Sequence, residues 1–544
     1  MSEPNEPDRG ADAASDADTA EVSSNRLLRS TSVVSGATLL SRILGLVRDM
    51  VFARFFAATL VMDAFLVANR IPNMLRRFFG EGAFSQGFVP VMARYREKHS
   101  DDEAREFVDA VAGTFGIILF VVTLIGVVAA PLLVVVVAPG LLQHDGGFDL
   151  ATLMLRFTFP YLFFVSLVAF AGGVLNTYRN FAVPAITPVI LNIVLIGAAI
   201  WWAPRLEEPG MALAYAVLLA GVIQLLFQLP FLARIKKLPR PKWRPKHEGV
   251  KRAGRLMLPA IFGSSVSQIN VLVGGIIASM LGVGKISLLY YSDRLMEFPL
   301  GLIGIALATV TLPYLSRQFA TQSLDAFAKT IDWSMRLVTV FAVPAAVGLI
   351  VLAEPLVATI FYGGNFTTMD VQMTALALQA FAIGLVGFSY VKVLAPAYFA
   401  REDTRTPVRV ALIALAVNFV LSIALAWWLT INGYAANHAG LALAVSVAAL
   451  LNAWLLYRGL RREQVIRPTS GWMKLIARVA IACGLMIAIL EYLDRPLAWW
   501  TGVDALERAG WLAVCVGGGA ALYGFALLAL GVRARDFQFK DPSP

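Results

Sequence analysis

Long apolar stretches recur along the chain from residue 31 to residue 531, separated by short polar segments. As helices, these stretches are each about long enough to cross a hydrocarbon layer of ~30 Å. Their length excludes an outer-membrane barrel, whose strands are ~10 residues long and alternate in polarity. We therefore expect an all-α polytopic membrane protein with about 14 transmembrane helices. The expected spans are residues 31–56, 60–80, 106–137, 150–175, 183–203, 211–233, 254–281, 286–313, 331–353, 371–398, 407–430, 438–457, 473–491 and 509–531.

The composition agrees with this class. Hydrophobic residues make up 58% of the 544 and charged residues 15%, with a mean hydropathy of +0.70. A soluble chain of this length needs more polar surface to cover its core. Cys483 and Cys515 fall in apolar stretches, the four histidines are scattered, and no GxxxxGK[ST] phosphate loop occurs. These features predict a protein that is not an enzyme and that needs no metal or other cofactor.

The positive charge is distributed by loop. The formal net charge is +10, and Lys and Arg concentrate in alternate loops, whereas the opposite loops hold little beyond Arg205, Lys285, Arg495 and Arg508. Cytoplasmic loops are the ones enriched in Lys and Arg, so both termini are expected in the cytoplasm. Because the charge is not gathered on a soluble domain, we expect no nucleic-acid partner.

Two pairs of segments repeat at an offset of about 220 residues, on the same side of the expected membrane. Residues 69–94 parallel residues 293–317, and residues 178–188 parallel residues 398–407. Two parallel six-helix lobes around a central cavity, with two extra C-terminal helices, explain these repeats and are typical of transporters.

The lobes give a domain organisation. The basic segment between them is interpreted as a topology determinant beside anionic lipid, with a partner-binding site as the alternative. The acidic, polar leader is expected to be disordered. The expected parts are a disordered cytoplasmic tail (1–25), an N-terminal lobe (26–233), a basic cytoplasmic linker (234–253), a C-terminal lobe (254–458), two extra helices (459–531) and a cytoplasmic tail (532–544).

Charged residues also occur inside the expected spans, on the first, second and eighth. Each charge near the middle of a membrane costs at least ~3 kcal/mol, so these side chains must pair with one another or line a wet cavity. The candidate site residues are Arg42, Arg48, Asp49, Asp63, Arg70, Asn73, Arg76, Arg77, Glu81, Asp293, Arg294 and Glu297.

Their spacing favours a cavity. Asp63, Arg70 and Arg77 recur every seven residues and so share one face of a helix. Internal salt bridges, such as Arg294 with Glu297, are the structural alternative. Arginines outnumber the mid-span carboxylates on the first two spans, however, and guanidinium groups bind phosphate oxygens in pairs. An anionic, phosphorylated substrate is therefore expected.

Four motifs resemble those of the lipid II flippase (MurJ/MviN) family. They are SRILGLVRD (41–49), TLVMDAFLVA (59–68), RIPNMLRRFFGEGAFSQGFVP (70–90) and YYSDRLMEFP (290–299). The third is the most specific, and the similarity extends over nearly the whole chain, from about residue 26 to residue 530.

The resemblance implies the multidrug/oligosaccharidyl-lipid/polysaccharide exporter fold, with two lobes opening alternately to either side of the bacterial inner membrane. It implies lipid II, the undecaprenyl-pyrophosphate disaccharide-pentapeptide precursor of peptidoglycan, as the substrate. Arg42, Arg48 and Arg294 would meet the pyrophosphate, the other charged residues would line or gate the cavity, and the last two helices would hold the lipid tail. Membrane lipids and cell-wall synthesis proteins are the other partners to expect.

Four other functions are alternatives to this one. They are a flippase for another polyprenyl-linked oligosaccharide, a drug or cation antiporter of the same superfamily, an enzyme acting on the same lipid, and a scaffold for cell-wall assembly. An antiporter for cations would need an acidic cavity, and an enzyme would need a carboxylate pair or metal in a sizeable loop. Without an ATPase motif, the energy would come from substrate flux, the membrane potential or a monovalent cation gradient, with Asn418 as a polar candidate for a cation ligand.

Overall fold

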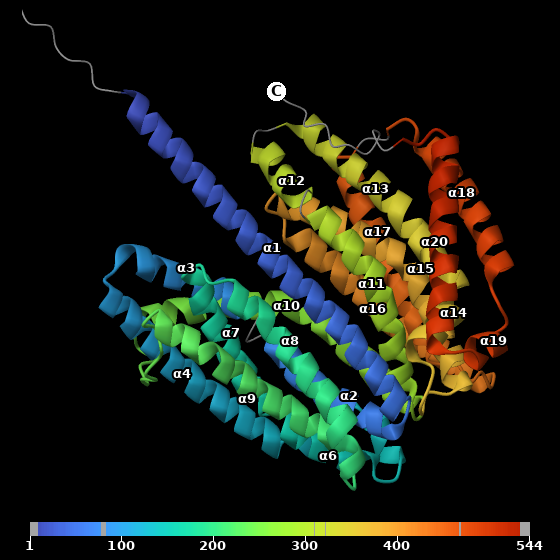
Figure 1. The fold of residues 1–544 in the computed structure, drawn as a ribbon, viewed down its shortest axis with the longest axis horizontal. Helices are drawn as coiled ribbons and strands as arrows, with labels where there is room; N and C mark the ends of the chain where they lie inside the picture. Colours follow the sequence, from blue (N-terminus) through green and yellow to red (C-terminus); the bar gives the residue numbers. More distant parts are fainter. Residues whose placement is uncertain (1–8, 78–82, 309–310, 321–322, 467–468, 534–544) are drawn as a thin grey trace, which may run out of the picture. The chain divides into compact units, whose positions relative to one another are not determined.

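Helices make up almost all of the described chain in the computed structural model (Figure 1). The structure describes residues 9–77, 83–308, 311–320, 323–466 and 469–533. In this part of the chain, strand-like pairing is limited to one bridge between Gly363 and Phe366. Ten helical segments of the described chain are long and apolar enough to cross a membrane. The prediction of an all-α multi-pass membrane protein is therefore confirmed.

Four further spans expected from the sequence coincide with helices that are less apolar. These helices are α1 (Arg9–Phe56), α2 (Leu60–Arg76), α10 (Glu248–Met280) and α11 (Lys285–Ala308). Three of them, α1, α2 and α11, carry the intramembrane charges, which lower the mean hydropathy of a span.

Helix α1 extends beyond its expected span. The sequence predicts a span at 31–56 after a disordered leader, whereas the helix begins at Arg9. No glycine or proline occurs between Gly10 and Gly36, and alanine and glutamate in the leader are strong helix formers. A helix can therefore continue from the span into the leader.

The chain divides into two compact units that interleave along the sequence. Unit 1 comprises Met1–Arg48, Asn69–Val128 and Arg156–Phe262, and unit 2 comprises Asp49–Ala68, Ala129–Leu155 and Gly263–Pro544. The helices lying wholly in unit 1 are α3 (Ala83–Lys98), α4 (Asp101–Val128), α7 (Tyr161–Thr177), α8 (Ala182–Gly197) and α9 (Met211–Arg234). Those lying wholly in unit 2 are α5 (Ala130–Val137), α11, α12 (Thr311–Ala320), α13 (Leu324–Val351), α14 (Ala353–Phe361), α15 (Thr368–Phe399), α16 (Arg405–Ile431), α17 (Ala439–Arg462), α18 (Trp472–Leu493), α19 (Leu497–Gly502) and α20 (Ala505–Ala529).

The core of unit 1 is built on stacked phenylalanines from α3, α4 and α7. The ring of Phe88 lies 4.8 Å from that of Phe84, 5.6 Å from Phe107 and 5.2 Å from Phe170. Gly173 on α7 lets Phe88 approach, because a Cβ there would already lie 3.3 Å from the ring. Aromatic pairs at these distances stabilise a core beyond the area they bury.

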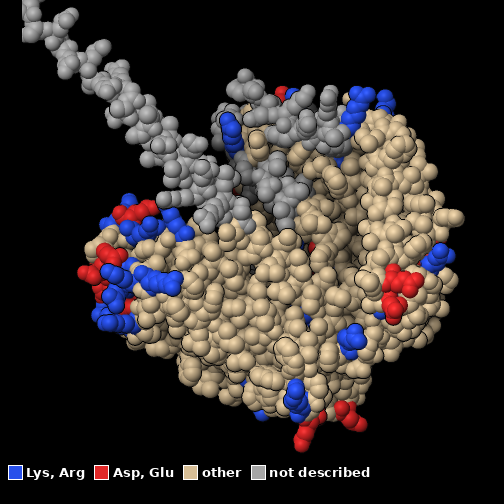
Figure 2. All heavy atoms as spheres, viewed as in Figure 1, with Lys and Arg blue, Asp and Glu red and all other residues tan. Residues whose placement is uncertain are grey.

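The basic segment after α9 is folded onto α4. Lys237 is buried, and its Nζ lies 2.5 Å from Asp101 Oδ1. The backbone N–H of Lys242 donates to Asp109 O at 3.0 Å, and its Nζ lies 3.2 Å from Asp109 Oδ2. Gly113 permits this approach, since a Cβ there would clash with the backbone of Lys242. Figure 2 shows charged side chains of both signs gathered near the N-terminal end of α4. Part of the positive charge of the segment is therefore paired with acidic side chains of the same unit.

The core of unit 2 depends on close packing between α15 and α17. A Cβ on Gly384 would lie 2.6 Å from Ser446 Oγ, and one on Gly387 would lie 2.7 Å from the carbonyl carbon of Ala449. Small residues that let helix backbones approach are the usual interface of membrane helices. Helices α18 and α20 form a separate C-terminal pair, side by side in Figure 1.

Four helices end in the same local conformation. Arg179 after α7 and Glu402 after α15 both adopt φ of 61°, and the next residue donates its N–H to the carbonyl five residues back. The same arrangement follows α9 at Lys236 and α17 at Gln464, each with φ of 56°. This is the Schellman cap, here without glycine. Two of these turns, at Arg179 and Glu402, lie in segments that are parallel in the sequence.

Candidate functional site

The candidate site residues divide by charge between the two units. Every described carboxylate among them belongs to unit 2, and all of the arginines except Arg294 belong to unit 1. Glu81 lies outside the described residues. The unit 1 residues are Arg42, Arg48, Arg70, Asn73, Arg76 and Arg77. The unit 2 residues are Asp49, Asp63, Asp293, Arg294 and Glu297.

Asp49 is the centre of a hydrogen-bonded cluster in unit 2. Its side chain is 0% exposed, accepting a bond at Oδ1 from Tyr290 Oη and one at Oδ2 from Arg294 Nε, both at 2.7 Å. Tyr290 and Arg294 are four residues apart on α11, so they lie on one face of that helix. A buried carboxylate holding two donors fixes the orientation of both.

Arg294 has a second acidic neighbour one turn along α11. Its Nη1 donates to Glu297 Oε2 at 2.7 Å, and Glu297 is half exposed. The side chain of Arg294 is 31% exposed. Two of its five N–H groups are committed to these carboxylates, which leaves the outer part of the guanidinium fork accessible to an anion.

Asp63 caps the beginning of α11. Its oxygens accept hydrogen bonds from Gly284 N at 2.6 Å, Ser287 N at 2.8 Å and Ser287 Oγ at 2.6 Å. Gly284 has φ of +82° and lies against the carbonyl of Ala58, so a side chain there would clash. A carboxylate at a helix N-terminus satisfies orphan N–H groups and meets the positive end of the helix dipole. The buried Asp63 therefore fastens α2 to α11.

On unit 1, Arg48 is held by α8. Its Nη1 donates to Asn192 Oδ1 at 3.1 Å, and Asn192 Nδ2 donates in turn to Ser41 O at 3.1 Å. Arg42, six residues earlier on α1, is exposed. On α2, Arg70, Asn73 and Arg76 are half-buried, and Arg77 follows the helix as an exposed residue.

Three side chains close to the candidate residues, Tyr290, Asn192 and Lys392, were not among the sequence candidates. Tyr290 and Asn192 are uncharged, and a search for intramembrane charge passes over them. Lys392 is a charge within the expected span 371–398 and could have been found by the same criterion. Its Nζ donates to Leu300 O on α11 at 3.1 Å, beside Gly304. Lys392 therefore adds a cation close to the helix that carries Arg294.

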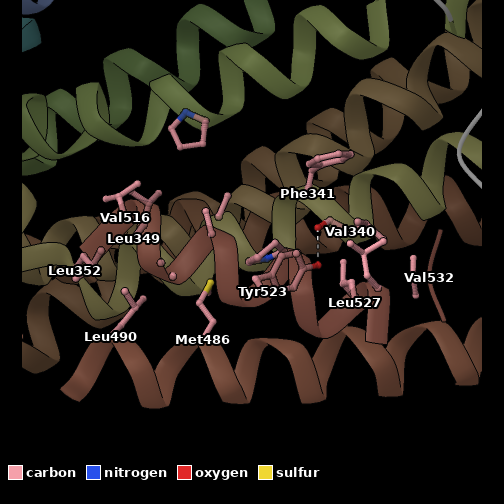
Figure 3. Close-up of a pocket in the computed structure, with 18 of the residues that line it drawn as sticks. Val340, Phe341, Leu349, Leu352, Met486, Leu490, Val516, Tyr523, Leu527 and Val532 are labelled. Atoms are coloured by element: carbon pink, nitrogen blue, oxygen red, sulfur yellow. Dashed lines mark hydrogen bonds between the residues drawn. The ribbon is translucent and has the colours of Figure 1, made fainter. Parts of the chain in front are cut away.

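An apolar groove of about 660 Å³ lies in unit 2, next to the C-terminal helix pair (Figure 3). Its walls come mainly from α13 and α20, and Pro299 of α11 lies at one side. The hydrogen bond from Tyr523 Oη to Val340 O, at 2.7 Å, joins the two walls. Since Pro299 is five residues after Arg294 on the same helix, the groove and the Asp49 cluster share α11.

Neutral side chains surround Asn418, the candidate cation ligand. Its Nδ2 donates to Asn270 Oδ1 at 2.6 Å, and Ser422 Oγ donates to its Oδ1 at 3.4 Å. Across the described residues, no group of three or more His, Cys, Asp or Glu side chains is arranged to hold a metal ion.

Known proteins resemble the chain over nearly its full length. The family model described as Lipid II flippase MurJ matches residues 52–506. The probable lipid II flippase MurJ of Vibrio cholerae serotype O1 is 46% identical over 522 residues, covering 95% of this chain and 98% of that protein. The lipid II flippase MurJ of Burkholderia cenocepacia is 40% identical over 518 residues, covering 94% of this chain and 99% of that protein. A solved structure titled lipid II flippase MurJ, inward closed conformation, superposes with a TM-score of 0.74 at 26% identity, covering 91% of this chain and 99% of that one.

Proposed function

The chain belongs to the lipid II flippase MurJ family, and from that membership we propose that it carries lipid II from the cytoplasmic to the outer leaflet of the bacterial inner membrane. The family is one of transporters rather than enzymes, so no bond of the substrate is broken. The barrier is the transfer of a charged pyrophosphate and its sugars through hydrocarbon.

A cationic lining would lower that barrier for the headgroup. The observation that carries this proposal is Arg294, held by the buried Asp49 inside a membrane helix with part of its guanidinium exposed. Such an arrangement is preorganised for two phosphate oxygens. Arg42 and Arg48 on unit 1 are proposed as further pyrophosphate ligands, and the remaining charged residues as lining or gating groups.

The groove would accept the lipid tail. It is apolar, and it lies along the α18 and α20 pair in the same unit as Arg294. Because Pro299 borders the groove, a tail placed there leaves the phosphate end near α11. The tail can then remain in an apolar environment while the headgroup moves.

Alternating access requires that the ends of the transporter open in turn. We assign one such closure to the Asp63 cap, whose three hydrogen bonds fasten α2 to the start of α11. Opening that end of unit 2 would need these bonds to break. The membrane potential is a suitable energy source, since one charge crossing 100 mV is worth ~2.3 kcal/mol. A monovalent cation gradient is the other proposed energy source.

The charge pattern of the loops supports an orientation with both termini in the cytoplasm. In this orientation the basic segment on α4 is also cytoplasmic, where lipid II is made available to the transporter. Cell-wall synthesis proteins are proposed partners.

The function is tested by reconstituting the protein in proteoliposomes and following fluorescent lipid II between leaflets. We expect translocation by the unaltered chain and its loss in Arg48→Ala and Arg294→Ala. Arg401→Gln is a matched control, because it breaks an ion pair of unit 2 at 2.6 Å far along the chain from the site. Normal translocation by both arginine variants would refute the cationic lining. Equal transport of a polyprenyl-pyrophosphate with an unrelated oligosaccharide would broaden the substrate class.

A further inference from the structure

A polar cluster joins α13 to the turn that begins α18. Asp332 on α13 accepts at Oδ1 from Thr469 Oγ1 and Trp472 Nε1, both at 2.7 Å. Its Oδ2 accepts from Arg336 Nε, also at 2.7 Å. Two of the three donors to this carboxylate thus come from the start of α18, and the third comes from Arg336, one turn along α13.

Arg336 completes the cluster. Its Nη2 donates to Thr469 Oγ1 and to Ser470 O, each at 3.0 Å, and its guanidinium lies 5.2 Å from the centre of the Trp472 ring. The side chains of Arg336 and Asp332 are 25% and 16% exposed, so water screens this pair less than a surface salt bridge. We call Asp332, Arg336, Thr469, Ser470 and Trp472 the α13–α18 clamp.

In the described part of the chain, the clamp is accompanied by further polar contacts along the groove. At the other end of the C-terminal pair, Arg508 Nη1 donates to Ala358 O at 3.2 Å. Between the ends, Tyr523 bonds to Val340 across the groove, as Figure 3 shows. The groove walls themselves are apolar and offer little directional bonding. The apolar packing of α13 with α18 and α20 brings the walls together, and the polar contacts add the directional bonds that fix the tilt of the pair.

The groove is long, so a small change in the tilt of one wall changes its width at the far end. Lining residues on α20 run from Val516 to Leu528, which is roughly 18 Å at 1.5 Å per residue. A change in the tilt of the α18 and α20 pair displaces the walls most at the points farthest from the remaining fastenings. A long chain must fit along the whole groove, whereas a short chain occupies only part of it.

We propose that the α13–α18 clamp is a positioning element that holds the C-terminal pair at the tilt required for a long polyisoprenoid chain, so that it sets selectivity for chain length. This inference rests on the proposed function. It assigns no contact between the clamp and the substrate. It predicts that loss of the clamp slows the translocation of long-chain substrates while the headgroup site stays intact.

The test compares two substrates with the same lipid II headgroup, one with an undecaprenyl chain and one with a farnesyl chain. The full-length protein is reconstituted as the unaltered chain, Asp332→Asn, Thr469→Val and the control Arg401→Gln. Asp332→Asn removes the charge that faces Arg336, and Thr469→Val is a milder change that removes two hydrogen bonds. The readout is the ratio of initial translocation rates for the long and short chains.

We expect this ratio to fall about tenfold in Asp332→Asn, with a smaller fall in Thr469→Val and none in Arg401→Gln. An unchanged ratio in both clamp variants overturns the inference. This holds whether the rates for the two substrates persist or fall together, because a general loss of folding slows both substrates alike. Failure of the unaltered chain to move either substrate overturns the proposed function instead.

Discussion

Arg294 donates its Nε hydrogen to Oδ2 of Asp49 at 2.7 Å, although the two residues are 245 positions apart in the sequence. Asp49 is completely buried, and Arg294 is partly exposed. Asp49 thus holds Nε of the guanidinium and Glu297 accepts from Nη1, while the exposed N–H groups that remain can meet a ligand. An arginine held in this way loses less side-chain freedom on binding an anion than a mobile one.

The first prediction concerns the groups that orient Arg294. Asp49→Asn removes the charge facing the guanidinium, and Tyr290→Phe removes one neutral donor to the same carboxylate. Hydrogen bonds to a charged group are worth about 1.5–3 kcal/mol, so we expect roughly tenfold slower lipid II translocation in Tyr290→Phe and a larger loss in Asp49→Asn. Initial rates in proteoliposomes measure both. Equal rates in Tyr290→Phe and the unaltered chain would show that Tyr290 does not position Asp49.

The second prediction concerns the cap of α11. In Asp63→Asn an amide group takes the place of one carboxylate oxygen, so a donor faces the N–H of Gly284 or Ser287. We expect a loss of about 1–3 kcal/mol at this junction and a looser start of α11. Lys285→Cys supplies a label site, and its reaction with a membrane-impermeant thiol reagent should be faster in the Asp63→Asn background. Ser287→Ala, which removes only the hydroxyl donor, should give an intermediate rate; identical rates in all three contradict the cap.

The third prediction concerns the interface of α15 and α17. A Cβ on Gly387 would lie 2.7 Å from the backbone of Ala449, whereas a Cβ on Gly484 of α18 meets nothing within 4 Å. Overpacking a tight contact costs typically 1–3 kcal/mol, while Gly→Ala in an open helical position gains about 0.5–1 kcal/mol. Gly387→Ala should therefore lower the melting temperature in detergent, and Gly484→Ala should hold or raise it. A lower melting temperature in both would mean that the close contact is not the cause.

The fourth prediction concerns the basic segment on α4. Lys237 is buried beside Asp101, whereas Lys246 is exposed in the same segment. Lys237→Ala leaves the segment without this attachment, so we expect proteinase K to cut between α9 and α10 several-fold faster in detergent solution. Lys246→Ala should be cut at the rate of the unaltered chain. A similar rate for Lys237→Ala would indicate that the contacts of Arg240, Lys242 and Arg244 with α4 are sufficient to hold the segment.

Much of the fold follows from local pattern. Apolar length identified the spans, and charges within three of them identified α1, α2 and α11 as the exceptional helices. Both depend on the composition of single segments, because the cost of placing a charge in hydrocarbon is high wherever the segment packs. The repeated segments 178–188 and 398–407 predicted a duplication, and the turns at Arg179 and Glu402 in these segments have the same backbone conformation.

Tertiary packing decided what each charge does. Heptad spacing places Asp63 on a face with Arg70 and Arg77, whereas the donors that join Asp63 to α11 are backbone and hydroxyl groups more than 220 residues away. Asp49 likewise meets Tyr290, which no search for charge would select. Pairing depends on which helices pack together, and hydropathy carries no information about that choice because lipid and protein interiors are equally apolar.

The sequence by itself therefore determined the membrane class and the family, since these depend on local chemistry and on motifs read directly from the chain. Only the tertiary structure showed that Asp49 holds Arg294, that Asp63 caps α11, and that α13 and α20 form an apolar groove fastened by the α13–α18 clamp. The physical reason is range: helical periodicity and hydropathy act over a few turns, whereas each of these contacts joins segments that only the packing of helices brings within hydrogen-bond distance.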